Sequence, residues 1–240
     1  MSTIALLRAE VLEANVGLVR HGLVVHAFGN ASAIDRDTGL VVIKPSGVPY
    51  EQLEADTLVV TDLDGRVVEG PFRPSSDLPT HLALYKAFPQ IGAVVHTHSR
   101  FATIWAQAGR ELPCLGTTHA DSFRGAIPIT EAMTAGEIQS AYEWNTGQVI
   151  VRRFAGLDPM EIPAVLVHGH GPFCWATSAR SASDLATILE EVACIAWHAV
   201  ALNPSVQPLA PELRDKHFFR KHGPRAYYGQ REAEGGLASP

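Results

Sequence analysis

The chain has 240 residues, 46% of them apolar, and a formal net charge of −6. Its length suffices for one full core, and we expect a single domain over residues 1–230 followed by a flexible tail over 231–240, because no linker interrupts it. A negative charge without a clustered basic face excludes nucleic-acid and membrane surfaces and favours a small ligand. Three cysteines without Cys-x-x-Cys spacing and a charged N-terminal segment predict a cytoplasmic protein without disulfides.

The predicted elements begin with an amphipathic helix, in which apolar residues recur at helical spacing from Ile4 to Leu18. Strands are expected over residues 24–32 and 40–44, each running into a polar turn. Two β-branched runs around Asp64-Gly65 predict a hairpin over residues 58–68.

Helices follow in the second part of the chain. A helix over residues 80–88 is expected just after Asp77, because Pro79 suits a first helical turn. A capping-box pair opens another over 134–143, and Ser183 or Asp184 is expected to cap a long helix. With the hairpin, this alternation predicts a layered α/β fold with a mixed or antiparallel sheet.

Two apolar runs end in histidines one residue apart, His96 with His98 and His168 with His170. Residues i and i+2 of a strand point to one side, with Cβ atoms about 7 Å apart. Such pairs suit zinc, which accepts neutral histidine nitrogens and carboxylate oxygens. A single strand-end histidine is usually an ordinary polar residue, but two pairs in one chain favour a metal site.

Small and hydroxylated residues lie at several element boundaries, at Gly29-Asn30, Ser46-Gly47 and Ser75-Ser76. Backbone amides and hydroxyls at such junctions can bind a phosphate or carboxylate, and Lys44 would add a positive charge. Taken singly, these runs are equally typical of ordinary turns, and Lys44 of a solvated strand end.

Together with the histidines, these segments resemble the class II aldolase family, in its epimerase branch, from about residue 4 to residue 230. Six motifs occur in the family's order: Gly29-Asn30-Ala31-Ser32, Lys44-Pro45-Ser46-Gly47, Pro74-Ser75-Ser76-Asp77, Val95-His96-Thr97-His98-Ser99, Gly116 to Asp121, and Val167 to Pro172. The C-terminal run from Asp215 to Gln230 points to the same branch. The resemblance implies a three-layer α/β/α sandwich around a central, mainly antiparallel sheet. It also implies epimerisation of a ketopentose 5-phosphate at C4, from L-ribulose 5-phosphate to D-xylulose 5-phosphate, by retro-aldol cleavage and re-addition.

The resemblance also implies a set of site residues. Zinc, or another divalent metal, would be held by four ligands, Asp77, His96, His98 and His170. His168 would at most lie behind these ligands and would not bind the metal itself. The substrate phosphate would be held by Gly29, Asn30, Lys44, Ser46, Gly47, Ser75 and Ser76.

The acid/base pair implied by the resemblance is Asp121 and Tyr228, with Tyr228 reaching the site from a neighbouring subunit of a homotetramer. Thr117, Glu143 and His217 match positions near that site, with secondary roles.

The chain departs from the epimerase pattern after Asp121, where Ser122-Phe123-Arg124-Gly125 stand in place of tyrosines around a phenylalanine. We therefore expect Arg124 to influence which sugar phosphate is held. One alternative is an aldolase that releases dihydroxyacetone, or its phosphate, and an aldehyde; such aldolases typically have glutamate where this chain has Asp77. Another is a non-catalytic scaffold similar to the adducin head, which the complete ligand and acid/base sets disfavour.

Overall fold

A computed structural model of the protein describes residues 3–224 and 226–229, and the tail expected over 231–240 lies outside the described residues. The α-helices are α1 (Thr3–Arg20), α2 (Leu78–Ala87), α3 (Arg100–Gln107), α4 (Thr117–Ala120), α5 (Ala135–Gln139), α6 (Tyr142–Arg153), α7 (Ala179–Leu202) and α8 (Pro211–Lys221). The strands are β1 (Asn30–Asp35), β2 (Leu40–Ile43), β3 (Val59–Thr61), β4 (Val67–Glu69), β5 (Ala93–His96), β6 (Ala164–Leu166) and β7 (Pro172–Ala176).

The strands form one sheet in the order β4-β3-β2-β1-β5-β7-β6, and each neighbouring pair is antiparallel. The pairing of β3 with β4 confirms the predicted hairpin. Successive residues of the central strands enter different cores, as Val94 and Val95 do in β5 and Cys174 and Trp175 in β7. Side chains alternate between the two faces of a sheet, so this pattern means that other elements must cover both faces.

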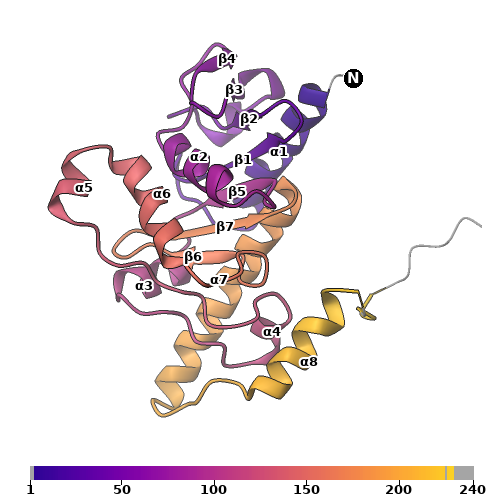
Figure 1. The fold of residues 1–240 in the computed structure, drawn as a ribbon, viewed down its shortest axis with the longest axis vertical. Helices are drawn as coiled ribbons and strands as arrows, with labels where there is room; N and C mark the ends of the chain where they lie inside the picture. The colour runs from indigo at the N-terminus through magenta and orange to yellow at the C-terminus, as the bar shows by residue number, and fades with distance from the viewer. Residues whose placement is uncertain (1–2, 225, 230–240) are drawn as a thin grey trace, which may run out of the picture.

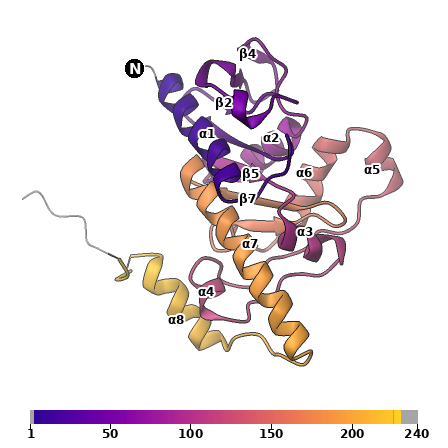
Figure 2. The same cartoon turned by 180° about the vertical axis from the view of Figure 1, so that it is seen from behind.

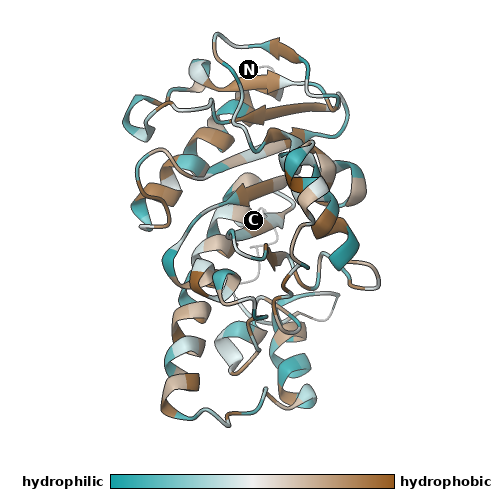
Figure 3. Ribbon diagram, turned by 90° about the vertical axis from the view of Figure 1, so that its left-hand side faces the viewer, coloured by the Kyte–Doolittle hydropathy of each residue, from teal (hydrophilic) through white to brown (hydrophobic). Residues whose placement is uncertain are grey.

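Helices supply the two covering layers. Helices α1, α3 and α7 pack together on one side of the sheet, and α2 packs with α6 on the other (Figures 1 and 2). The apolar strands lie between helices of mixed hydropathy (Figure 3). This arrangement confirms the expected α/β/α sandwich with an antiparallel sheet.

Helix α7 runs from the sheet into an extension that also contains α4 and α8, and there α8 packs against α4 (Figures 1 and 2). By length and composition alone, α7 is able to cross a membrane. It also contacts β5, β7, α1 and α3, and its buried apolar residues belong to the core on that side of the sheet.

The first expected strand is shorter than predicted. It begins at Asn30 rather than at residue 24, because the segment before it contains His26 with φ 58° and Gly29 with φ 79°. Left-handed residues of this kind cannot continue a strand. A Cβ at Gly29 would lie 2.9 Å from the His96 carbonyl oxygen, so the loop can approach β5 this closely only with glycine there.

Two helix boundaries also differ from the prediction. Thr134 does form the capping box of α5, but that helix ends at Gln139, and the non-helical Ser140 and Ala141 separate it from α6. Helix α7 begins at Ala179, with Ser178 as its cap, so the expectation of Ser183 or Asp184 was wrong. A residue caps a helix with its side-chain oxygen where its own backbone is extended, and Ser178 has this conformation.

Candidate metal centre and phosphate pocket

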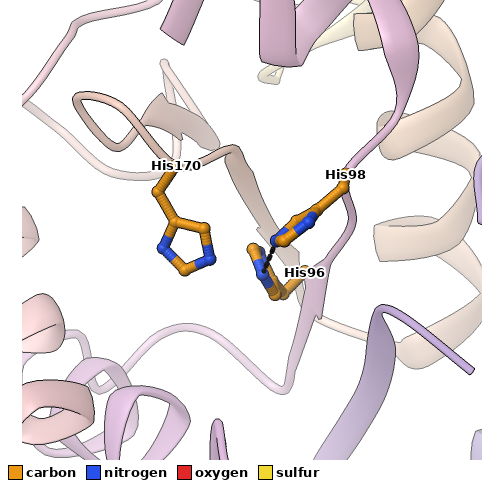
Figure 4. Close-up of side chains that lie close together, drawn as sticks. All are labelled: His96, His98 and His170. Carbon is orange, nitrogen blue, oxygen red and sulfur yellow. Dashed lines mark hydrogen bonds between the residues drawn. The ribbon is translucent and has the colours of Figure 1, made fainter. Parts of the chain in front are cut away.

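Three histidines from two segments distant in sequence converge at one end of the sheet. His96 is the last residue of β5, His98 follows it, and His170 lies in the turn between β6 and β7. Because His96 pairs with Phe173 across the β5–β7 ladder, the turn before β7 lies beside the end of β5. One nitrogen of each imidazole lies within 4.8 Å of the others, and the three rings face a common point (Figure 4).

Gly171 allows this approach. A Cβ at Gly171 would lie 2.8 Å from the Thr97 carbonyl oxygen and 3.2 Å from the His98 ring, too close for any side chain. His168, by contrast, is exposed at the tip of the turn and faces Gly109. The two histidine pairs therefore differ: both members of the first pair face the cluster, but only His170 of the second pair does. Strand β6 ends at Leu166, so the alternation of side chains along a strand does not apply to His168.

The ring of His96 is held in one orientation. Its Nδ1 donates to the Pro172 carbonyl oxygen at 2.9 Å, and the Phe173 ring is stacked on it with centroids 4.1 Å apart. The neutral imidazole then presents Nε2 as an electron-pair donor, as metal-ligating histidines do. Burial lowers the pKa of His96, His98 and His170, which favours the neutral form that binds a metal.

The imidazoles of His96 and His98 approach each other in a way that fits a bound cation. The Nε2 atoms of His96 and His98 lie 3.1 Å apart, a position in which two lone pairs would repel each other without a proton or a cation between them. The donor chemistry of the cluster therefore suits a divalent metal that binds nitrogen and oxygen ligands.

Asp77 lies beside the histidines, immediately before α2, and lines the same cavity. Its Oδ2 accepts from Asn30 Nδ2 at 2.7 Å. Burial raises the pKa of Asp77, but the nearby His96 and His81 and the Asn30 amide outweigh that effect and lower it overall. The aspartate is thus a carboxylate, although its oxygens are not among the ligand atoms grouped within 4.8 Å.

A cavity of about 320 Å³ opens in front of these side chains. Its lining includes the four expected metal ligands and all of the expected phosphate-holding residues: Gly29, Asn30, Lys44, Ser46, Gly47, Ser75 and Ser76. Two loops meet there because Ser46 N donates to the Arg73 carbonyl oxygen and Ser75 N to that of Lys44. These two amides are therefore already bonded. The Ser75 hydroxyl accepts from Asn30 Nδ2 at 3.1 Å and from Asp77 N at 3.3 Å, and it keeps its own hydrogen to donate to an anion.

Lys44 is buried, with 2% of its surface exposed, and this lowers its pKa. Its Nζ lies 2.9 Å from the Val48 carbonyl oxygen and 4.8 Å from the centre of the Tyr50 ring, and among the described residues it has no carboxylate partner. A buried ammonium group without a counterion is costly, and an anion in the cavity would compensate it.

Tyr50 was not predicted from the sequence. Besides underlying Lys44, its hydroxyl donates to the carbonyl oxygens of Phe28 and Gly29, at 3.1 and 2.9 Å. It therefore joins two of the loops that form the cavity. An aromatic residue three positions after Ser46-Gly47 carries no local signal of this role.

The expected acid/base residues form a second cluster, separate from the cavity. Asp121, which follows α4, accepts from His217 Nδ1 at 2.9 Å and from Arg220 at 3.0 and 2.7 Å, and Lys221 Nζ lies 3.3 Å away. The Tyr228 ring lies 4.9 Å from the Arg220 guanidinium. Burial raises the pKa of Asp121, but the hydrogen bonds from Arg220, His217 and Lys221 outweigh it and hold the pKa below its usual range.

The expected secondary residues are also outside the cavity lining. Thr117 opens α4, and its carbonyl oxygen accepts from Asp121 N at 2.9 Å. Glu143, in the first turn of α6, accepts a hydrogen bond from Thr80 through its backbone. Neither these residues nor Asp121, His217 and Tyr228 line the cavity that contains the histidines.

Comparison with known proteins identifies the family. The profile of the Class II Aldolase and Adducin N-terminal domain matches residues 9–197. The chain belongs to the class II aldolase family. It is 54% identical over 225 residues, 94% of this chain and 99% of the relative, to the L-ribulose-5-phosphate 4-epimerase UlaF of Salmonella paratyphi B.

Solved class II aldolase structures share the fold. An L-fuculose 1-phosphate aldolase superposes with a TM-score of 0.76 at 26% identity, covering 90% of this chain and 95% of that one. The L-fuculose-1-phosphate aldolase of Thermus thermophilus, at 24% identity, covers 85% of this chain and 98% of its own with a TM-score of 0.64. Class II aldolases are in general dependent on divalent metals, in agreement with the histidine cluster.

Proposed function

We propose that the protein is a zinc-dependent epimerase that interconverts L-ribulose 5-phosphate and D-xylulose 5-phosphate at C4. The observation that carries the proposal is the single cavity in which His96, His98, His170 and Asp77 face a lysine- and serine-lined anion site. A volume of about 320 Å³ suits a small sugar phosphate. The identity of 54% to a named epimerase over 94% of the chain supports the same substrate class.

Three histidine nitrogens and one carboxylate oxygen are a ligand set that zinc accepts. When bound, a divalent cation supplies positive charge opposite the enediolate oxygens of the cleaved sugar. The chain's own contribution is to keep the histidines neutral and oriented, through burial and the His96 to Pro172 hydrogen bond.

The substrate's chemistry explains why bond cleavage is needed. The C4 hydrogen is not adjacent to the C2 carbonyl, so its removal as a proton would leave an unstabilised carbanion. If the C4 hydroxyl instead loses its proton, the C3–C4 bond can break, leaving C4 as an aldehyde and the bonding electrons in an enediolate over C2 and C3. Rotation of the aldehyde and re-addition on its other face inverts C4.

The phosphate site has a defined task in this scheme. Glycolaldehyde phosphate, the fragment that contains C4 and C5, must stay in the cavity while its carbonyl turns over. Lys44 and the hydroxyls of Ser46, Ser75 and Ser76 would anchor the phosphate through charge-assisted hydrogen bonds. The aldehyde carbon is then the part that is free to rotate.

One residue must accept the hydroxyl proton, and another must return it on the opposite face. We assign these steps to Asp121 and Tyr228. Both lie in one cluster outside the metal cavity of their own chain, which supports a homotetramer in which one subunit supplies both residues to its neighbour's cavity. The resemblance alone had suggested that Tyr228 crosses the interface by itself.

The decisive experiment is to incubate purified, zinc-loaded protein with L-ribulose 5-phosphate and follow D-xylulose 5-phosphate. We expect one molecule of D-xylulose 5-phosphate to form for each molecule of L-ribulose 5-phosphate consumed, without net release of fragments. Accumulation of dihydroxyacetone and glycolaldehyde phosphate would instead identify an aldolase. If the zinc-loaded protein consumes no substrate, the proposal is wrong.

A further inference from the structure

Arg124, at the position where the chain departs from the epimerase pattern, binds two carboxylates within the protein. Its NH1 lies 2.7 and 2.9 Å from the two carboxylate oxygens of Glu161, and its Nε and NH2 lie 3.2 and 3.1 Å from those of Asp215. The guanidinium also lies over the Phe219 ring, 4.7 Å from its centre. These contacts occupy both edges and one face of the group.

This engagement is evidence against a direct role for Arg124 in substrate binding. The guanidinium donates hydrogen bonds to the carboxylates of Glu161 and Asp215, which satisfies most of the donors that a sugar phosphate would need. The expectation that Arg124 influences which sugar phosphate is held therefore lacks a contact to support it.

Arg124 connects three segments that are distant in sequence. It belongs to the loop that follows α4, Glu161 to the turn before β6, and Asp215 and Phe219 to α8. Arg214 also holds Asp215, with Nε 2.8 Å from Oδ1, the oxygen that Arg124 Nε contacts. A planar guanidinium that binds two carboxylates and stacks on a ring fixes direction as well as distance.

Helix α8 depends on such contacts because it buries little apolar surface. Of its described side chains only Phe218 is buried. Elements with few buried apolar contacts open locally at low free-energy cost, so polar contacts decide whether they stay docked. The same helix carries His217, Arg220 and Lys221, the groups that hold Asp121, and Arg220 also contacts the Tyr228 ring.

We propose that Arg124 is a positioning residue that fastens α8 to the loop after α4 and so holds Tyr228 and Arg220 in register with Asp121. This inference rests on the proposed function for its catalytic consequence. The fastening of α8 itself does not depend on that function.

The test compares Arg124→Leu, Arg124→Lys and Asp215→Asn with Arg152→Leu in the full-length, assembled protein. Arg152 is the matched control, because it forms an ion pair with Glu137 at 2.8 Å but lies on α6. Hydrogen exchange of α8 amides is the first readout. We expect exchange roughly three- to tenfold faster in Arg124→Leu and Asp215→Asn, an intermediate effect in Arg124→Lys, and none in Arg152→Leu.

Steady-state kinetics and metal content are the second readout. We expect kcat to fall by about tenfold or more in Arg124→Leu while KM and zinc content stay at wild-type values, since the metal and phosphate cavity is separate. Unchanged α8 exchange in both Arg124→Leu and Asp215→Asn would overturn the fastening. Faster exchange with unchanged kcat would overturn the positioning role. A wild-type protein without epimerase activity would reject the proposed function, and the exchange data would still decide the fastening.

Discussion

At the scale of single residues, His98 and His168 offer a matched pair, because both come from a His-x-His motif but only His98 faces the other histidines. We expect His98→Ala to weaken zinc binding by at least about 100-fold, since even residues behind the ligands typically contribute 10–100-fold. His168→Ala should retain zinc. Metal analysis after dialysis, with circular dichroism to check the fold, measures both. Equal zinc content in the two variants would contradict the assigned ligand set.

Ser76 tests the phosphate site. Its hydroxyl faces the cavity, and removal of one or two charge-assisted hydrogen bonds costs about 1.5–3 kcal/mol each. Ser76→Ala should therefore raise KM for L-ribulose 5-phosphate by roughly one to two orders of magnitude with a smaller change in kcat. Ser205→Ala, in the exposed loop after α7, is the control. Wild-type kinetics in Ser76→Ala would remove this residue from the site.

Tyr50 tests the connection between the cavity loops. Tyr50→Phe keeps the ring under Lys44 but removes the hydrogen bonds from the hydroxyl to the carbonyl oxygens of Phe28 and Gly29, both of which are partly buried contacts. We expect a loss of about 1–3 kcal/mol in the free energy of unfolding. Urea denaturation measures it, and a change below about 0.5 kcal/mol would show that the hydroxyl is dispensable.

Which site residues could be predicted depended on whether their signal was local. His96, His98, Asp77 and the serines stand in short ordered motifs, so their resemblance to the family predicted that they share a site, and they do line one cavity. The roles of Tyr50 and of the Phe173 ring on His96 arise only from chain segments that meet in three dimensions. No spacing within a single sequence encodes such contacts.

At the scale of elements, helices and strands with a periodic apolar pattern were predicted well, as α1 and the β3–β4 hairpin were. The errors lie where backbone conformation overrides pattern. The apolar residues from Val24 onward resemble a strand, but the left-handed His26 and Gly29 keep them in a loop. Helix α8 has no strong apolar face, and its place beside α4 is set by charged side chains that a hydrophobic pattern cannot register.

The ion pairs of α8 predict an acid-dependent stability. Hydrogen bonds from Arg124 and Arg214 lower the pKa of Asp215 to about 2. Because the folded-state pKa is below the unfolded one, this contribution is present above about pH 4 and is lost as the pH falls toward 2. The difference in urea midpoint between wild type and Asp215→Asn should therefore shrink from pH 5 to pH 2.5. A difference that stays constant over this range would show that Asp215 acts through something other than its charge.

At the scale of the whole molecule, the two halves of the proposed site lie in different parts of one chain. The metal cavity is at the end of the sheet. Asp121 follows α4 and Tyr228 contacts Arg220 of α8, and these two helices form the extension (Figures 1 and 2). A closed ring of subunits can bring the extension of one chain to the cavity of the next. The sequence could suggest this arrangement only through family resemblance, because a single chain carries no direct signal of its neighbours.

Mixing inactive variants distinguishes which residues cross the interface. We unfold two variants together in equal amounts and reassemble them at random. If one subunit supplies both Asp121 and Tyr228, a mixture of His98→Ala and Asp121→Asn restores a site whenever the cavity chain keeps His98 and its neighbour keeps Asp121. Each condition is met with probability one half, so about one quarter of the sites should recover.

The mixture of Asp121→Asn with Tyr228→Phe should recover nothing, because every extension then carries one lesion. The outcomes are reversed if Tyr228 alone crosses the interface. The mixture of Asp121→Asn with Tyr228→Phe would then regain about one quarter of the sites. The mixture of His98→Ala with Asp121→Asn would regain none, because every chain would carry one lesion in its own site. Failure of both mixtures, in tetramers shown to be mixed by mass, would mean that each chain completes its own site. Helix α8 would then have to leave Asp121 and reach the cavity of its own subunit.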